Sequence, residues 1–296
     1  MIFTPIRLLL LIVVATVSAL HADTNTNSAA TGKEVKAPVV AAPAAASPLF
    51  NLNVSENYDS LYMYRGINEL PNAGILSTTL EPVWHITSND TLSVPFWYAT
   101  AVGKTFSNGL QNYRELDVPV DYTHTIGNWT LGAGYQLYTY YNLEGVSPGG
   151  TGVQQEATLN IAYAFKTGDV TWTPSIAYFY ELGTANKYDY GTINAGSSFL
   201  SPQIAVEFPL YKDIITANPA LQYNFSFAYN DSSSNNGEVT KSYTGANNFQ
   251  VQFPITWQIT KLISITGYVA YSYQGANLVQ TAPSTVWGGA SVGLSF

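Results

Sequence analysis

The side chains best suited to metal binding and acid–base chemistry are few in this sequence, which has three histidines and no cysteine. His85 and His124 fall on predicted strands that are not neighbours, and alternation places them on opposite faces. Glu115 and Asp117 share one strand face, so this carboxylate pair could in principle do acid–base work. No motif connects these residues to a nucleophile or to a set of metal ligands. We predict no metal site, no cofactor and no catalytic residue, and hence no enzyme.

The composition excludes two common classes of protein. Hydrophobic residues make up 46% of the chain and charged residues only 10%, which is too little charge for an ordinary soluble surface. After residue 22, no apolar run approaches the roughly 20 residues that a membrane-spanning helix needs. The net charge of -8 disfavours a nucleic acid partner. Strands that face lipid on one side and polar groups on the other fit what remains.

The first 49 residues indicate export. Arg7 precedes an apolar stretch from Leu8 to Ala19, and small residues end it at Ala22, so residues 1–22 are predicted to be a signal peptide. Residues 23–49 are rich in Ala, Thr, Asn and Pro, and we expect a flexible periplasmic lead-in. The absence of cysteine suits a chain that crosses an oxidising periplasm unfolded. Residues 50–296 then form the folded domain.

From Phe50 onward, apolar and polar residues alternate in about twelve segments. Their approximate ranges are 50–65, 75–88, 91–104, 112–125, 128–142, 152–166, 169–181, 196–210, 214–229, 243–258, 262–274 and 285–296. Tight turns such as Asn89-Asp90 alternate with longer connections, the first of which runs from Gly66 to Gly74. Short periplasmic turns and longer extracellular loops are typical of transmembrane barrels. The prediction is therefore an all-β fold: a transmembrane, antiparallel, up-and-down β-barrel of about 12 strands.

One face of these strands is predicted to meet lipid. The last strand alternates and ends at the aromatic Phe296, which resembles the C-terminal sorting signal that the barrel assembly machinery recognises. Glu56 is the one clear charge on this face. Outward aromatic residues gather at two heights, as anchoring at two membrane interfaces requires. Those near tight turns are Trp84, Trp129, Trp172 and Trp257, and those near the loops include Tyr62, Tyr64, Tyr141, Tyr180, Tyr229 and Tyr273.

The other face is predicted to line a lumen with seven acids and one base. These residues are Asp59, Arg65, Glu81, Glu115, Asp117, Asp121, Glu156 and Glu207. Fixed negative charge between low-dielectric walls attracts cations and repels anions. Alternatively, the acids pair with Arg65 and tyrosine hydroxyls inside a plugged barrel, or some lie at the rims. Twelve strands would leave at most a narrow channel.

The first hairpin carries a family resemblance. The segments Leu52-Asn53-Val54-Ser55, Tyr64-Arg65-Gly66-Ile67-Asn68 and Gly74-Ile75-Leu76 resemble the opening of the TorF-like porin family. The likeness covers about 30 residues; Asn68 replaces the usual serine, and Val94-Pro95-Phe96-Trp97-Tyr98 departs from the family's third strand. The resemblance implies an outer-membrane barrel with a transport function, and it supplies no catalytic residue.

Together these patterns predict a porin of the Gram-negative outer membrane that passes small hydrophilic solutes or ions and prefers cations. Its partners would be outer-membrane lipid, the assembly machinery and the transported solutes. Two alternatives stay open. One is a structural or adhesive barrel whose extracellular loops bind a partner, and the other, the weakest, is a barrel lipid hydrolase.

Overall fold

The computed structural model describes residues 49–65, 67–68, 70, 73–103, 113–141, 151–183, 196–230, 242–274 and 284–296. The predicted signal peptide and the predicted lead-in, except for Leu49, lie outside these residues, as does most of each long loop. None of the described residues belongs to a helix long and apolar enough to cross a membrane.

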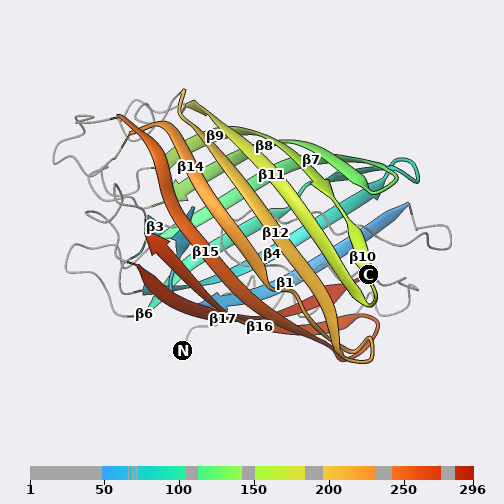
Figure 1. Ribbon diagram of the computed structural model, residues 1–296. Coiled ribbons are helices and arrows are strands. Elements are labelled where there is room, and N and C mark those ends of the chain that lie inside the picture. Colours follow the sequence, from blue (N-terminus) through green and yellow to red (C-terminus); the bar gives the residue numbers. More distant parts are fainter. Residues whose placement is uncertain are drawn as a thin grey trace.

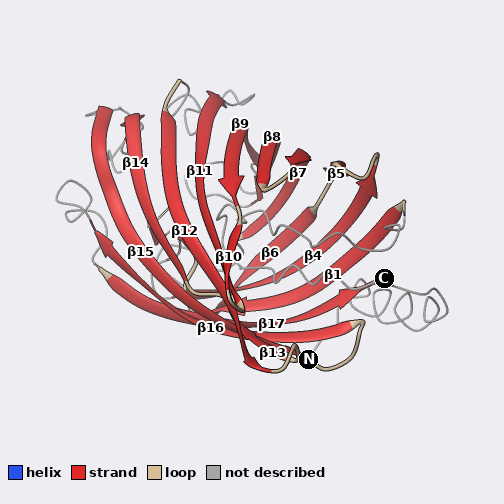
Figure 2. Ribbon diagram, turned by 45° about the vertical axis from the view of Figure 1, so that its right-hand side comes forward, coloured by secondary structure: helices blue, strands red, loops and turns tan. Residues whose placement is uncertain are grey.

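The described chain consists of β-strands joined by turns (Figures 1 and 2). Their bounds are β1 Phe50–Asp59, β2 Met63–Tyr64, β3 Ile67–Asn68, β4 Ala73–His85, β5 Asp90–Ser93, β6 Phe96–Gly103, β7 Arg114–Ile126, β8 Trp129–Tyr141, β9 Thr151–Tyr163, β10 Phe165–Thr167, β11 Val170–Gly183, β12 Ser198–Tyr211, β13 Ile215–Ala217, β14 Ala220–Asn230, β15 Ser242–Gln258, β16 Ile263–Gln274 and β17 Thr285–Ser295.

Several of these elements are pieces of one barrel strand. β5 and β6 both pair with β4 and β7, and β13 and β14 both pair with β12 and β15. Pro95 and Pro219 lie in the two breaks, where a residue without an N–H interrupts the ladder. β10 continues β9 along β11. Counted this way, the structure is a closed barrel of twelve antiparallel strands, which confirms the predicted fold.

The barrel closes between its first and last strands. β1 pairs with β17 over seven residues, from Asn53 opposite Ser295 to Asp59 opposite Gly289. Phe296 extends this seam, because its backbone exchanges two 3.0 Å hydrogen bonds with Leu52. The C-terminal residue therefore completes the cylinder, and no edge strand is left unpaired at the seam.

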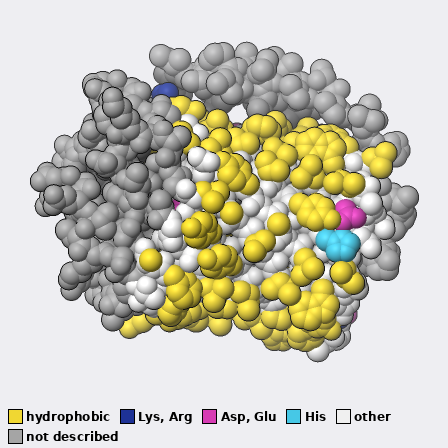
Figure 3. Space-filling model, turned by 90° about the horizontal axis from the view of Figure 1, so that it is seen from above, with side chains coloured by type: hydrophobic (Ala, Val, Ile, Leu, Met, Phe, Trp, Pro, Cys, Tyr) yellow, Lys and Arg dark blue, Asp and Glu magenta, His cyan; other side chains and the backbone are white. Residues whose placement is uncertain are grey.

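The two faces of the wall differ in chemistry as the alternation predicts. Large apolar side chains such as Leu159, Ile176 and Val286 are exposed on the outside, and Figure 3 shows hydrophobic side chains spread over the described surface. Polar residues such as Asn224, Gln250 and Thr266 are buried on the inside. Because backbone groups in lipid must be bonded within the protein, a closed barrel with this polarity is suited to span a bilayer.

The first strand differs from its predicted range of 50–65. β1 ends at Asp59, and the chain then turns inward to form a small hairpin of β2 and β3. We call residues 60–70 the inner hairpin. The alternation of Tyr62 and Tyr64 continues the pattern of β1. The predicted strand therefore ran on to residue 65, although the chain leaves the wall after Asp59.

Candidate channel lumen

The structure places most of the predicted lumen residues on the inner face of the wall. Asp59, Glu115, Asp117 and Glu156 are buried, and Glu81 and Asp121 are half-buried nearer the turns. Glu207 shares the inward register through its pairing with Thr171, but it is exposed near the turn end. Arg65 is buried in the same interior, although it belongs to the inner hairpin and not to the wall.

The inner hairpin crosses the interior near the loop end of the barrel. Tyr62 stacks on Trp97 of β6 with ring centroids 6.1 Å apart, and Met63 packs against Ala270 and Trp287 of β16 and β17. Tyr62 and Tyr64 are only 1% and 7% exposed. The prediction that these two tyrosines face the membrane interface is therefore wrong, because their segment turns into the barrel.

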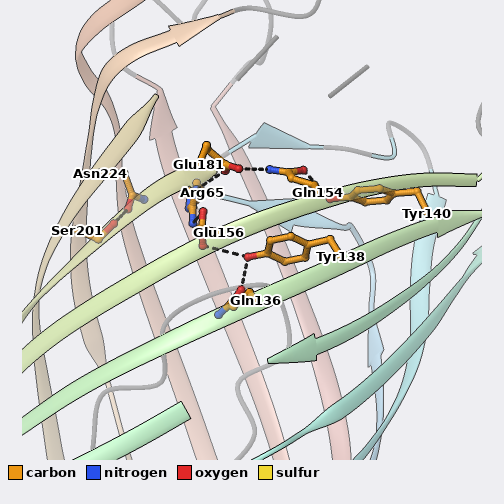
Figure 4. Close-up of polar contacts among 9 residues, drawn as sticks. All are labelled: Arg65, Gln136, Tyr138, Tyr140, Gln154, Glu156, Glu181, Ser201 and Asn224. Carbon is orange, nitrogen blue, oxygen red and sulfur yellow. Dashed lines mark hydrogen bonds and ion pairs between the residues drawn. The ribbon is translucent and has the colours of Figure 1, made fainter. Parts of the chain in front are cut away.

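Arg65 lies in the turn between β2 and β3 and contacts the wall at β9 and β11, and Figure 4 shows these contacts. Its guanidinium forms ion pairs with Glu156 of β9 and Glu181 of β11. Its Cζ atom lies 4.1 Å and 4.2 Å from the ring centroids of Phe179 and Phe199. Burial alone would lower the pKa of Arg65, but the neighbouring Glu156 and the other acidic groups raise it on balance, so the side chain stays charged.

The backbone of Arg65 is strained. Its φ angle of 49° lies in the left-handed region, which a non-glycine residue adopts at a cost of about 1 kcal/mol or more. The pairing of Tyr64 with Ile67 places Arg65 in the turn between β2 and β3. This turn aims the guanidinium at Glu156 and Glu181, and the contacts there offset the strain.

Tyrosine hydroxyls bond several of the buried carboxylates. Glu115 Oε2 accepts hydrogen bonds from Tyr62 and Tyr113, each 2.6 Å long. The Tyr138 hydroxyl lies 3.1 Å from Glu156 Oε1 and also contacts the side-chain amide of Gln136. Tyr268 of β16 donates to Asp59 across the barrel seam. The alternative in which acids pair with Arg65 and tyrosines therefore describes the loop end of the interior, while the position of Glu207 fits the alternative that some acids lie at the rims.

The part of the wall from β12 to β16 carries amides and hydroxyls in place of charges. Asn224 is the centre of this amide wall, because it accepts a 2.6 Å hydrogen bond from Ser201 and donates a 2.9 Å bond to Asn248. Asn248 then donates to Ser272 of β16. These side chains form a band across four neighbouring strands, β12, β14, β15 and β16. The interior thus has an acidic side and an uncharged polar side.

Along β7 and β12, the inward side chains become more exposed from the loop end toward the turn end. Along β7, Glu115 and Asp117 are buried, whereas Asp121 and Thr123 are half-buried. Along β12, Phe199 and Ser201 are buried and Glu207 is exposed. The inner hairpin therefore fills the loop end of the interior.

Most of the predicted interface aromatics lie on the outer surface. Trp84, Trp129, Trp257, Tyr180 and Tyr273 are exposed. Trp172 and Tyr141 are half-buried, with Trp172 stacked on Phe165, and the side chain of Tyr229 lies outside the described residues. Glu56 is exposed on the outer face as predicted, where it accepts a 2.6 Å hydrogen bond from Thr78.

The two histidines that the structure describes do not come together. His85 faces inward and His124 outward, where His124 Nδ1 lies 2.7 Å from Asp90 Oδ1. In the described part of the chain, no cluster of three or more acidic or histidine side chains is arranged to hold a metal ion.

Sequence reasoning missed the residues that surround Arg65. Phe179 and Phe199 are large aromatic side chains in the inward register of β11 and β12, between outward residues such as Tyr178 and Tyr180. An aromatic residue on an otherwise polar face was the available signal. Glu181 was recognisable as an inward acid at a strand end, but its closeness to Arg65 depends on the path of the inner hairpin.

Comparison with known proteins identifies the fold but no sequence family. No family model matches the chain, and no curated protein matches its sequence. The COG4313 outer membrane channel from Pseudomonas putida F1 matches in structure with a TM-score of 0.54 and 13% identity, over 88% of this chain and 100% of that one.

Two further barrels match at lower TM-scores. The translocator domain of the autotransporter NalP from Neisseria meningitidis gives 0.45 at 12% identity, over 84% of this chain and 89% of that one. The KdgM porin gives 0.45 at 9% identity, over 83% of this chain and 99% of that one. The closed twelve-strand barrel and its apolar outer belt are the architecture of bacterial outer-membrane proteins, and we place this protein in that membrane.

Proposed function

We propose that this protein is an outer-membrane channel for small hydrophilic solutes or ions, with a preference for cations. The observation that carries the proposal is the charge of the interior. Among the described residues, the buried ionisable side chains other than tyrosine are five acids and one base: Asp59, Glu115, Asp117, Glu156, Glu181 and Arg65. Such a surplus of negative charge lowers the energy of a cation inside the barrel and raises that of an anion.

The inner hairpin is the constriction of this proposed channel. It reaches from β1 to β9 and β11, and Arg65 fixes it there through two ion pairs. Since the inward side chains of β7 and β12 are more exposed toward the turns, we place the narrowest part of the proposed channel at the hairpin, near the loop end. A solute entering from outside would pass the hairpin before it reached Asp121 and Glu81.

The resemblance to the TorF-like porin family supports the same function. One of the three segments that carry it, Tyr64 to Asn68, belongs to the inner hairpin, and the other two lie in β1 and β4. We propose that this protein belongs with those porins, and that the segment they share forms the constriction. We also propose that the strand ending at Phe296 is recognised by the barrel assembly machinery.

The test of cation preference is the reversal potential in asymmetric potassium chloride across a planar bilayer. We expect the wild type to show cation preference, and we expect the double variant Glu115→Gln/Asp117→Asn to show less of it. Glu56→Gln is the matched control, because it removes a charge from the outer face and should leave the reversal potential unchanged. Anion preference in the wild type, or no shift in the double variant, would overturn the proposed selectivity.

The same recordings decide between a channel and other roles. A barrel that never conducts, alone or after removal of the Arg65 contacts, would refute the transport function and favour a structural or adhesive barrel. Assay of the detergent-solubilised protein for lipid hydrolysis would address the remaining alternative, and we expect no activity.

A further inference from the structure

The wall of the barrel holds a charged side chain in a setting built for a planar cation. We propose that β9, β11 and β12 carry a binding site for organic cations of the guanidinium type, and that Arg65 occupies this site in the present structure. We call Glu156, Glu181, Phe179 and Phe199 the guanidinium cage.

The cage contacts the guanidinium group in two ways, through aromatic rings and through carboxylates. The rings of Phe179 and Phe199 lie within 4.2 Å of Arg65 Cζ, in the range where aromatic rings attract a cation. Glu156 and Glu181 accept hydrogen bonds from the two terminal nitrogen atoms. A planar guanidinium combines edge donors with faces that stack, whereas an ammonium ion has no such plane.

The four cage residues are placed by strand register and not by the inner hairpin. Phe179 of β11 lies directly opposite Phe199 of β12, and Glu181 of β11 lies directly opposite Glu156 of β9. The wall therefore keeps the cage assembled when Arg65 is removed. Like charges directly opposite one another on neighbouring strands repel, and both carboxylates are at most 1% exposed. A cation beside the two carboxylates relieves this repulsion.

Arg65 is an imperfect occupant of the cage. Its Nη1 atom lies 3.5 Å from Glu181 Oε1, at the limit of a hydrogen bond. Its Nε atom is buried and has no hydrogen-bond partner among the described residues. Its backbone is in the left-handed region. A free guanidinium ion is not tied to a backbone, so it can turn its N–H donors toward both carboxylates without strain and can compete for the cage.

In the proposed channel, this competition would let a bound solute release the constriction. Only this consequence rests on the proposed function. A guanidinium-bearing solute that enters the cage displaces Arg65. The inner hairpin then loses its attachment to β9 and β11. The expected ligand class is small solutes that end in a guanidinium group.

The test uses the purified full barrel in detergent and measures the midpoint of thermal unfolding. In Arg65→Ala, we expect guanidinium chloride at low millimolar concentration to raise the midpoint, whereas urea, which has a similar shape but no charge, and sodium chloride should not. Arg114→Ala removes an exposed arginine from the outer wall and serves as the matched control, which guanidinium should not stabilise. Adding Glu156→Gln to Arg65→Ala should weaken guanidinium binding more than about tenfold.

Equal stabilisation by sodium chloride or urea, or equal stabilisation of Arg114→Ala, would overturn the proposal. If Arg65→Ala does not fold, guanidinium chloride is titrated into Arg65→Ala/Glu181→Gln in its place. This double variant lacks one charge of each sign. This experiment needs no conduction. A sealed barrel that binds guanidinium refutes the channel and leaves the cage, while a conducting barrel without guanidinium binding refutes the cage alone.

Discussion

Arg65 joins the inner hairpin to the barrel wall. The sequence predicted that Arg65 and Glu156 both point inward, because alternation alone sets the face of a wall residue. It offered ion pairs between Arg65 and the inward acids as an alternative, but it did not identify Glu156 as the partner, since Arg65 is not on the wall and its position depends on a turn with a left-handed residue. Contacts of this kind depend on the path of a loop, which periodicity does not encode.

The stability of the barrel tests the Arg65 contacts. Arg65→Ala leaves Glu156 and Glu181 buried without their cation, and we expect the free energy of unfolding to fall by about 3 to 5 kcal/mol. Arg65→Ala/Glu181→Gln should recover part of this loss, because only one buried carboxylate then remains. Urea titration in lipid vesicles, monitored by tryptophan fluorescence, measures the free energy of unfolding of both variants. An effect of Arg65→Ala no larger than that of Arg114→Ala would contradict the structure.

Most strands of the barrel were predictable to within a few residues, because period-two alternation and turn residues mark both their faces and their ends. β8 illustrates what the pattern hides. Gly132 and Gly134 lie on its inward face, where a Cβ atom would meet Asn160 at the first position and Asp121 and Thr158 at the second. The glycines thus leave room for polar side chains from β7 and β9, which only the register reveals.

Substitution at Gly134 tests this packing. We expect Gly134→Ala to destabilise the barrel by about 1 to 3 kcal/mol, because Asp121 and Thr158 must shift to admit the methyl group. Gly267→Ala in β16 is the control, since a Cβ atom added there would meet nothing within 4 Å and alanine should be tolerated. Unfolding free energies from urea titration compare the two, and equal effects would show that the inner face of β8 is not packed in this way.

Across the whole molecule, the sequence predicted the closed cylinder because low charge, alternation and alternating connection lengths all agree with it. It could not reveal how far the interior is filled. A porin and a plugged barrel share the same wall pattern, and the difference lies in the first connection, where β1 ends at Asp59 and the chain turns inward.

The orientation of the barrel in lipid has a depth-dependent test. Ile176 is 46% exposed near the middle of β11, and Ile126 is 56% exposed at the end of β7 beside a turn. We expect Ile176→Arg to cost about 2 to 4 kcal/mol and Ile126→Arg about 0 to 1 kcal/mol. Urea titration in phosphatidylcholine vesicles measures both costs. A greater cost at Ile126 would place the membrane elsewhere on the barrel.

Single-channel conductance of the wild type beside Arg65→Ala tests most directly whether the inner hairpin constricts a conducting barrel. We predict a small conductance for the wild type, the same small conductance for Arg114→Ala, and a larger conductance or more frequent openings for Arg65→Ala. Identical conductance in all three, or none in any of them, would contradict a channel constricted by the inner hairpin.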